Sequence, residues 1–589
     1  MDPRSYFETI ISANQMRLNQ LKRRALLLSM LRLIVFLIAV ALMYFFWGNS
    51  WVIALTFVVG FGLFLFLVSK YTDVRQARDF HAGLKKINKE EIKVLEGDVS
   101  HLSGGSEYLE AEHHYNQDID LFGEGSIFQM INRTGTKAGR DRLAKMLNSN
   151  EILQVKEKQE AIAELSKKID WRQHYQVTAS MVEEEVTAQK IVRWLQEYKP
   201  KLSKVFRILP GLFSLASLAI IILYGWGIIT GVVLGIWFFL GLGITGLYLK
   251  KITSLYNQTT QLKATLSQYA KLIWAVEEEV FESEHLQLAQ KNLQTEGMKA
   301  STILSKLVRE IGNLDQRNNI FFGLIANGFL LWDLRYSYRI EKWMKTYDAS
   351  VEKWFETITF FDSMNSFGNY AFIRPAYVFP LISNSDNEVL SATQLGHPNL
   401  YPEKRVDNHV SITNGDFFII TGANMAGKST FLRTIALNLV MANCGLPVCA
   451  QSFTYKPIKL ISSMRTSDSL KDDESYFFSE LKRLKFIVEE IQKDRYFIIL
   501  DEILKGTNSK DKAEGSKKFV QRLVASKSTG LIATHDLSLC SLENDLEEVK
   551  NYFFEAEIIN DELSFDYKLK EGICKNMNAS FLLKKMDIV

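Results

Sequence analysis

The sequence predicts a two-part fold, in which an all-α region with two transmembrane helical hairpins precedes an α/β domain at the C-terminus. Two long stretches without a charged residue, 33–69 and 208–249, predict the hairpins. After residue 375, β-branched and aromatic runs alternate with helical stretches, which is typical of an α/β unit. A chain of 589 residues is also too long for a single core, so several domains are expected.

Each uncharged stretch is divided in two by a short break. The breaks at 48–50 and 224–227 leave runs near membrane-spanning length on either side. Basic residues flank only the outer ends of the stretches: Lys22, Arg23, Arg24, Arg32, Lys70, Arg75, Lys201, Lys204, Arg207, Lys250 and Lys251. By the positive-inside rule, both turns face away from the cytosol. We therefore expect a multi-pass membrane protein whose remaining parts are cytoplasmic and whose hairpins contact the lipid bilayer.

A cleaved signal peptide and buried core helices are the alternatives for these stretches. A signal peptide has one apolar run and a cleavage site, whereas the first stretch is a double run that begins at residue 33. Membrane insertion is therefore favoured. A third apolar run, Ile320–Trp332, is too short to span a bilayer and is followed at once by Asp333 and Arg335. We expect this run to be a core helix of the soluble part.

The segments 73–204 and 251–362 are rich in Glu, Lys, Gln, Leu and Ala. Apolar residues recur at intervals of three and four, as in "AIAELSKKI" at 161–169, which predicts long amphipathic helices. The formal charge of +3, from 70 basic and 67 acidic residues, gives no hint of a nucleic-acid partner. The four cysteines have no CxxC spacing, which favours reduced cytosolic thiols over a zinc site or a disulfide framework.

A glycine-rich turn stands between an apolar strand and a helix in the C-terminal part. Its spacing, Gly422-x4-Gly427-Lys428-Ser429, is the phosphate-loop pattern. The glycines let backbone N–H groups turn toward phosphates at a helix N-terminus, Lys428 meets the β- and γ-phosphates, and the Ser429 hydroxyl completes a Mg²⁺ shell. The predicted nucleotide-binding residues are Gly422, Ala423, Asn424, Met425, Ala426, Gly427, Lys428, Ser429 and Thr430.

Two further strands end in polar residues that suit phosphate chemistry. The run 496–500 precedes Asp501 and Glu502, and the run 531–533 precedes Thr534 and His535. We expect Asp501 to hold Mg²⁺ through water and Glu502 to polarise an attacking water. His535 can reach the γ-phosphate or orient that water. Together with Lys428, these side chains predict a site that hydrolyses ATP with Mg²⁺.

The motifs resemble those of the MutS family, whose ATPase is of the ABC type. The similar segments are "TGANMAGKSTFLR" (421–433), "LDEILKGTNSKD" (500–511), "ATHDL" (533–537), "GHPNL" (396–400), "DSLKDDESYFFSELKRL" (468–484) and "DYKLKEG" (566–572). Weaker likenesses lie upstream at 121–147 and 360–375, where the family has its helical core and levers. The resemblance thus implies a MutS-like helical core joined to an ABC-type P-loop ATPase.

The resemblance also implies a homodimer with composite active sites. Ser475 occupies the position of the signature-loop serine that reaches the nucleotide of the opposite subunit, and Asn508 and Ser509 fall in the turn that crosses that interface. His397 lies where the family's purine pocket begins. One departure is the acidic pair at 473–474, where relatives have a small glycine-containing loop, so slow or partner-triggered hydrolysis is expected.

Larger departures concern DNA. Mismatch-recognising members of the family begin with a domain that carries a Phe-x-Glu wedge, but here Phe7 precedes a membrane hairpin with no such domain around it. The second hairpin lies roughly where relatives insert the clamp that closes on a duplex. The resemblance therefore implies a membrane-anchored MutS-like variant without the mismatch-recognition domain.

The predicted organisation has five parts. They are the N-terminal segment and first hairpin (1–75), the first part of the helical core (76–204), the second hairpin (205–251), the second part of the core and lever (252–375), and the ATPase domain (376–589). Two functions stay open: a membrane-anchored ATPase that binds DNA, mispaired or branched, and an ATP-driven dimer switch that acts on a membrane or protein partner. An ABC transporter is disfavoured, because the apolar runs carry almost no polar residues to line a path.

Overall fold

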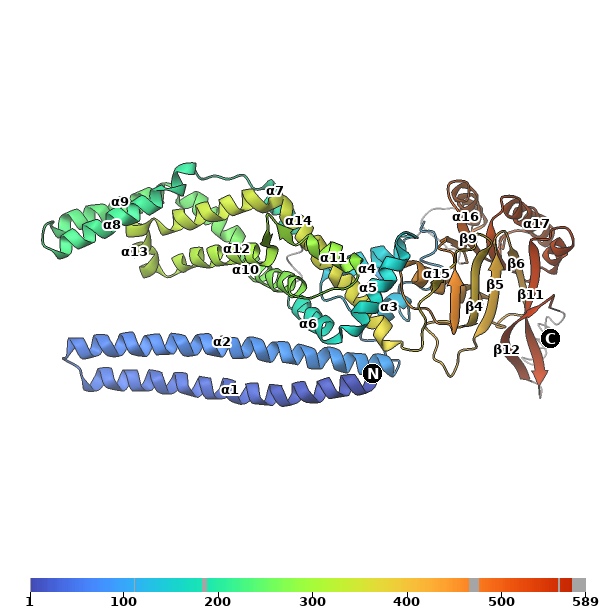
Figure 1. Cartoon of the computed structure of the whole chain (residues 1–589), viewed down its shortest axis with the longest axis horizontal. Helices are drawn as coiled ribbons and strands as arrows, with labels where there is room; N and C mark the ends of the chain where they lie inside the picture. The colour runs from blue at the N-terminus through green and yellow to red at the C-terminus, as the bar shows by residue number, and fades with distance from the viewer. Residues whose placement is uncertain (1, 111, 183–187, 465–475, 560–561, 575–589) are drawn as a thin grey trace.

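The protein is elongated, with apolar hairpin turns at one end and the α/β domain at the other (Figure 1). The computed structural model describes residues 2–574 except 111, 183–187, 465–475 and 560–561. The prediction of a helical region followed by an α/β unit is confirmed by the order of the elements.

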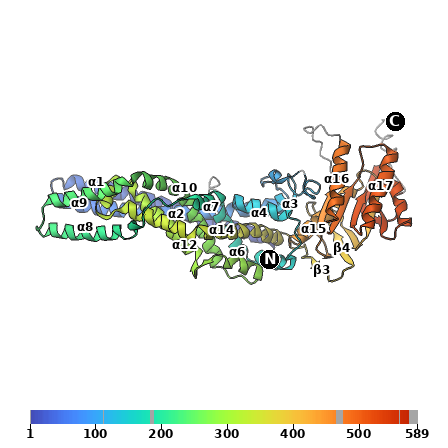
Figure 2. The same ribbon diagram turned by 90° about the horizontal axis from the view of Figure 1, so that it is seen from above.

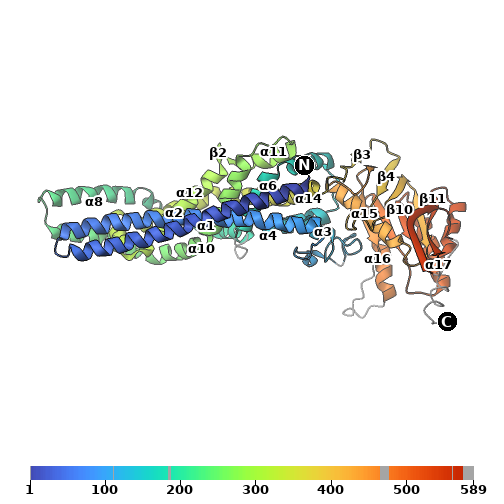
Figure 3. The same cartoon turned by 90° about the horizontal axis from the view of Figure 1, so that it is seen from below.

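The first hairpin consists of α1 (Pro3–Phe45) and α2 (Ser50–Leu95), which pack along each other (Figure 3). Asp2 caps the first helix by accepting from the Ser5 N–H, and Asn49 caps the second by accepting from Val52. Both helices are long and apolar enough to cross a membrane. Because α2 continues without a break to Leu95, the predicted boundary at residue 75 lies inside a helix.

The base of this hairpin is fixed to the helical core by polar contacts. The amides of Asn88 and Gln173 exchange two hydrogen bonds of 2.9 Å, and both side chains are buried. Arg133 forms a buried ion pair with Glu91, which also accepts from Asn369 of α14 (Trp332–Ile373) at 3.0 Å. Removing one partner of a buried ion pair is strongly destabilising, because it leaves an uncompensated charge in the interior. The Arg133–Glu91 pair therefore fixes the base of the hairpin at one place on the helical core.

The segment that follows is more broken than the sequence indicated. After α2, residues 96–126 contain only the short η1 (Ser106–Tyr108) among the described residues. Short helices then follow: α3 (Ile127–Ile131), α4 (Lys137–Asn148), α5 (Val155–Lys167), α6 (Ile169–Ser180), α7 (Ala188–Glu197) and η2 (Lys204–Arg207). The prediction of long helices over 73–204 is therefore wrong beyond residue 95.

The second hairpin consists of α8 (Leu209–Gly225) and α9 (Gly231–Leu247), each of 17 residues. The chain bends by 64° into α10 (Leu249–Glu277). In the described part of the chain, α1 and α2 are each long and apolar enough to cross a membrane. The bent pair of α9 and α10 would be a third membrane-spanning segment if the two helices are taken as one. The three views agree that both hairpins reach the same end of the molecule (Figures 1, 2 and 3).

After α10 the chain forms a helical bundle and then turns back at the apolar end. Its elements are α11 (Glu284–Lys291), β1 (Gln294–Thr295), β2 (Met298–Lys299), α12 (Ala300–Asp315), η3 (Gln316–Asn318) and α13 (Ile320–Leu330). The prediction that Ile320–Trp332 forms a core helix is wrong. Phe321 is 82% exposed and Ile320 is 73% exposed, and α13 packs against α8 and α9 instead.

The helix α14 links the two ends of the molecule. It has 42 residues, which corresponds to about 63 Å at 1.5 Å per residue. It begins beside α13 and ends at the α/β domain, running through the middle of the molecule (Figure 2). Contacts along its length with α4, α5, α7, α10 and α12 bury most of its C-terminal half. This helix is therefore placed to transmit movement between the two ends.

The α/β domain contains two sheets. The six-stranded sheet has the order β12 (Glu562–Glu571), β11 (Val549–Ile559), β6 (Phe417–Gly422), β10 (Thr529–Ala533), β9 (Tyr496–Asp501) and β8 (Lys459–Ser463), and all its pairs are parallel except β11 with β12. The four-stranded sheet has the order β3 (Leu381–Ile382), β7 (Ser452–Tyr455), β4 (Glu388–Leu395) and β5 (Asn408–Thr413). The helices are α15 (Lys428–Asn443), α16 (Tyr476–Glu490), α17 (Ser509–Ala525) and η4 (Leu537–Asn544).

The loop before α3 docks the helical core onto this domain. Arg483 of α16 donates to the carbonyl oxygens of His113 and His114 at 2.9 and 2.6 Å. The Ser462 hydroxyl donates to the Asp118 carboxylate at 2.6 Å, and both side chains are buried. The core is thus held against β8 and α16 of the α/β domain.

Candidate functional site

The turn between β6 and α15 has the backbone shape that a phosphate loop needs. Gly422 and Gly427 have φ angles of 145° and 104°, and Met425 has a φ of 66°. A Cβ atom on Gly422 would lie 2.6 Å from the carbonyl oxygen of Phe554, so no other residue fits there without movement of the backbone. The turn ends at the N-terminus of α15, where unpaired backbone N–H groups favour an anion.

Lys428 lies folded over this turn. Its Nζ donates to the carbonyl oxygens of Gly422 and Ala423, both at 2.9 Å, and the side chain is buried. Burial lowers the pKa of Lys428, while Asp501 and Glu502 act in the opposite direction. Since a buried ammonium is stabilised by a neighbouring negative charge, Lys428 is suited to face phosphate oxygens.

The carboxyl ends of β6, β10 and β9 meet beside the turn. Ala533 of β10 is paired with Ile420 of β6 on one side and with Asp501 of β9 on the other. The side chains predicted from three separate strands are therefore brought together, as expected at the carboxyl edge of a parallel sheet. Glu502 adopts a φ of 51° and its N–H donates to the Ala533 carbonyl at 2.9 Å, which fixes its backbone at this edge.

His535 lies between the lysine and the glutamate. Its Nε2 is 3.3 Å from Lys428 Nζ and 3.3 Å from Glu502 Oε1. Burial lowers the pKa of His535 and the nearby Lys428 ammonium lowers it further, while Glu502 acts in the opposite direction. A neutral ring can either accept from Lys428 or donate to Glu502 through Nε2, but not both at once. His535 can therefore donate to the Glu502 carboxylate only when its Nε2 does not accept from Lys428.

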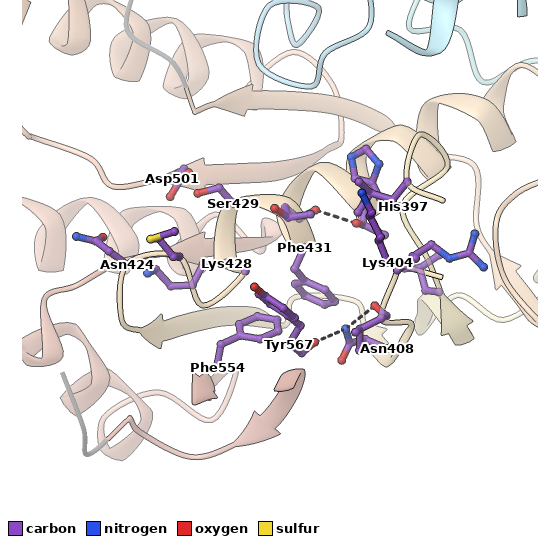
Figure 4. A pocket seen from close by; sticks show the side chains of 18 of the residues that line it. His397, Lys404, Asn408, Asn424, Lys428, Ser429, Phe431, Asp501, Phe554 and Tyr567 are labelled. Carbon is purple, nitrogen blue, oxygen red and sulfur yellow. Dashed lines mark hydrogen bonds between the residues drawn. The ribbon is translucent and has the colours of Figure 1, made fainter. Parts of the chain in front are cut away.

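These residues line one pocket of about 510 Å³ that continues well beyond the turn (Figure 4). Asn424, Met425, Lys428, Ser429 and Thr430 lie along one part of it, with Asp501, Glu502 and His535. Among the predicted loop residues, Gly422, Ala423 and Ala426 shape the turn without lining the pocket. The other part is lined by His397, Lys404, Asn408, Phe431, Phe554 and Tyr567. The pocket thus joins a polar end to an aromatic end.

The aromatic end contains residues that sequence reasoning did not assign. The Asn408 side chain donates to the Tyr567 carbonyl at 3.0 Å and accepts from the Leu569 N–H at 2.8 Å, which ties β5 to β12. Tyr567 has a φ of 52°, and its Cδ1 would lie 3.0 Å from a Cβ atom on Gly427. The similarity at 566–572 was the only signal for this segment, and it gave Tyr567 no role.

His397 belongs to the aromatic end, as the resemblance implied for a purine pocket. Its side chain is buried, and burial lowers the pKa of His397 to about 4. The Asn399 N–H donates to its Nδ1 at 3.3 Å. A neutral imidazole in the same part of the pocket as Phe431 and Tyr567 is suited to a flat heteroaromatic ring.

Ser429 and Asp501 fit the demands of Mg²⁺. Both line the polar end of the pocket, and Figure 4 shows the hydroxyl and the carboxylate near each other. Within the described ranges there is no cluster of three His, Cys, Asp or Glu that would hold a metal unaided. Mg²⁺ in nucleotide sites takes one or two protein oxygens and completes its shell with phosphates and water, so two ligands suffice.

Of the residues implied to act across a dimer, Asn508 can be placed relative to this pocket. Ser475 and the acidic pair at 473–474 are outside the described residues. Asn508 is exposed and caps α17 by accepting from the Asp511 N–H at 2.9 Å, and Ser509 is the first residue of that helix. Asn508 is not among the residues that line the pocket of its own chain.

Comparison with known proteins places the similarity in the C-terminal part. Residues 418–584 match the family model "MutS domain V". The human "MutS protein homolog 4" is 30% identical over 234 residues, which cover 38% of this chain and 24% of that protein. The "DNA mismatch repair protein MutS" of Orientia tsutsugamushi is 34% identical over 173 residues, 29% of this chain and 19% of that protein.

A third relative, the "DNA mismatch repair protein MutS" of Aquifex pyrophilus, is 33% identical over 180 residues, 30% of this chain and 21% of that protein. The matches thus span about a quarter of the relatives' lengths or less. They show that the α/β domain is similar to MutS domain V and to part of these relatives.

Proposed function

We propose that this protein is a membrane-anchored, MutS-like ATP hydrolase. The observation that carries the proposal is the convergence of Lys428, Asp501, Glu502 and His535 in one pocket beside the phosphate-loop turn. Three strands far apart in sequence deliver these groups to one sheet edge, and the family similarity covers the same strands. The aromatic end of the pocket then receives the adenine.

The chemistry follows from these positions. Lys428 and the N-terminus of α15 balance the phosphate charge, and Ser429 with Asp501 would hold Mg²⁺, which when bound neutralises charge on the β- and γ-phosphates. Glu502 takes a proton from the attacking water as its oxygen bonds to the γ-phosphorus and the bond to the β-phosphate oxygen breaks. His535 orients that water or the carboxylate, since its Nε2 is within 3.3 Å of Glu502.

We further propose that two copies close on the nucleotide. The resemblance assigns Ser475, Asn508 and Ser509 to the opposite active site, and the exposure of Asn508 at the start of α17 is compatible with that role. In this arrangement ATP lies between two subunits, and its hydrolysis opens the interface. The helix α14 then carries the change from the α/β domain to the apolar end of the molecule.

The hairpins anchor the protein in this proposal. Exposed apolar side chains cover α1, α2, α8 and α9 at the end opposite the α/β domain, and lipid would remove that surface from water. The protein is then a multi-pass membrane protein with its core and ATPase domain in the cytoplasm. Cysteines placed at Asn49 and Gly225 should react only with a reagent added from the outside. Labelling from the cytosolic side would contradict this topology.

DNA is the proposed ligand of the switch, because relatives of the α/β domain are named as DNA mismatch repair proteins. The second candidate is a membrane or protein partner, and it is favoured by the exposed apolar hairpin of α8 and α9, which lies roughly where the resemblance implies a clamp. The detergent-purified chain should be tested for DNA binding, with and without ATP, at two salt concentrations. Binding to DNA phosphates weakens steeply with salt, with a log–log slope of about −0.9 per phosphate neutralised.

If the chain does not bind DNA at low salt in any nucleotide state, DNA is excluded as the ligand and a membrane or protein partner is favoured. For the hydrolase itself, the test is Mg²⁺-dependent release of phosphate by the full-length chain. An inactive but folded chain that also fails to bind ATP would overturn the proposal.

A further inference from the structure

The helix α13 presents an apolar face that nothing in the described structure covers. Ile320, Phe321, Leu324 and Ile325 are 73%, 82%, 47% and 59% exposed. Their spacing places them on one side of a single helix, since residues three to four positions apart are neighbours. The helix contains no charged residue, from Ile320 to Leu330. In a water-soluble protein this surface would be a liability for aggregation.

The opposite face of α13 packs closely on the second hairpin. A Cβ atom on Gly241 of α9 would lie 2.2 Å from the carbonyl oxygen of Gly328, and one on Gly328 would lie 2.2 Å from Phe238. The two backbones therefore touch at a pair of glycines. Small residues at a helix crossing are typical of helices that associate within a bilayer, where close packing replaces the hydrophobic drive.

Each end of α13 carries a polar group with a partner inside the protein. Asn319 accepts from the Phe322 N–H at the start of the helix. Near its end, the Ser217 hydroxyl of α8 donates to the Phe329 carbonyl at 2.6 Å and accepts from the Trp237 indole of α9 at 2.8 Å. These contacts join three helices through one buried serine. Backbone groups without a partner are costly in lipid, so this pairing suits a helix surrounded by hydrocarbon.

The length and flanks of α13 limit how far it can insert. Its 11 residues correspond to about 16 Å, which is too short to cross a hydrocarbon core of about 30 Å. Arg317, before the helix, forms an ion pair of 3.4 Å with Asp333, just after it. The chain therefore enters and leaves on the same side. Leu331, with a φ of 48°, makes the sharp turn into α14.

We propose that α13 is a further membrane element, which lies in the cytosolic leaflet with its exposed face against lipid acyl chains. This inference rests on the proposed insertion of α8 and α9. Lipid is the occupant because the apolar surface of α13 continues that of the hairpin on which it packs, where Leu215 and Ile236 are also exposed. Since α14 begins immediately after α13, the bilayer then fixes the start of the linking helix.

The test measures the surroundings of nitroxide labels on the full chain in vesicles of phosphatidylcholine and phosphatidylglycerol. The test position is Ile325→Cys, the bilayer reference is Leu218→Cys on α8, and the aqueous reference is Ser305→Cys on α12, all exposed. The four native cysteines are buried, so the unsubstituted chain treated in parallel provides the labelling blank. Phe321→Cys serves as a second test position if the first variant does not fold.

The inference predicts that labels at 325 and 218 collide more with oxygen than with a water-soluble nickel complex, and that 305 shows the reverse. Position 325 should be shallower than 218. If 325 behaves like 305 while 218 is in lipid, the inference on α13 is wrong and the hairpin stands. If 218 also collides with nickel, the proposed insertion fails. If 325 is shielded from both reagents, protein covers the face, and a second copy of the chain replaces lipid as its partner.

Discussion

The α/β domain and the unit formed by α8, α9 and α13 are both built from apolar runs, but they are covered differently. Phe418, Ile419 and Ile420 of β6 are at most 1% exposed, because strands and helices enclose them on both faces. In contrast, Leu215 of α8 is 67% exposed and Phe321 of α13 is 82% exposed. Apolarity alone therefore does not say whether a segment is a core. A segment is part of a core only where other elements of the chain pack over its apolar side chains.

The largest expected effect belongs to the enclosed region. The substitution Lys428→Ala should abolish tight ATP binding and Mg²⁺-dependent hydrolysis, because it removes the buried ammonium that faces the phosphates. Nucleotide affinity and phosphate release check this. Lys518→Ala, at an exposed position further along α17, is the matched control and should leave both unchanged. Unaltered ATP affinity in the first variant would remove Lys428 from the site.

The next effect separates binding from chemistry. Glu502→Gln should bind ATP but hydrolyse it about 10²- to 10⁴-fold more slowly, since the amide cannot take the proton from water. The same variant should accumulate as a dimer with ATP, which light scattering can measure. Normal turnover in Glu502→Gln would show that another group acts as the base.

The pH dependence of stability tests the burial of the aromatic end. The pKa of His397 falls from its ordinary value near 6.5 to about 4 on folding, so the unfolded chain binds a proton that the folded chain rejects. The stabilising contribution is complete above pH 6.5 and is lost between pH 6.5 and about 4, at up to about 1.4 kcal/mol per pH unit.

Thermal unfolding of the detergent-purified chain should therefore show a steeper loss of Tm over this range than the His397→Gln variant shows. The difference between the two chains isolates the histidine, because their other titrating groups are the same. Parallel pH curves for both chains would mean that His397 titrates normally.

The smallest expected effect concerns the exposed region. Gly241→Leu should push α13 away from α9, with a cost of about 1–3 kcal/mol for overpacking. Gly243→Leu is the matched control, because a Cβ atom there meets nothing within 4 Å. Lipid accessibility at residue 325 and the thermal stability of both variants test this. Equal behaviour would show that the glycine crossing is not a tight contact.

The sequence allowed prediction of those parts that depend on local chemistry. The turn at 422–429 carries its own glycines and lysine, and the polar residues after β9 and β10 follow uninterrupted apolar strands. Asn408 and Tyr567 could not be assigned in this way, because Asn408 lies outside every motif, the motif at 566–572 gives Tyr567 no role, and both reach the pocket only through tertiary pairing. The exposure of the Ile320–Trp332 run could not be predicted either, because an apolar run of this composition is a core helix only if other elements surround it.

The most direct measurement of the central claim is ATP hydrolysis by the full-length chain in floated vesicles after an alkaline carbonate wash. The wash removes proteins held only at the membrane surface, so activity in the floated fraction reports an anchored enzyme. The account predicts Mg²⁺-dependent phosphate release in that fraction and none from the Lys428→Ala chain. A chain recovered in the supernatant, or a floated chain that never hydrolyses ATP, would contradict it.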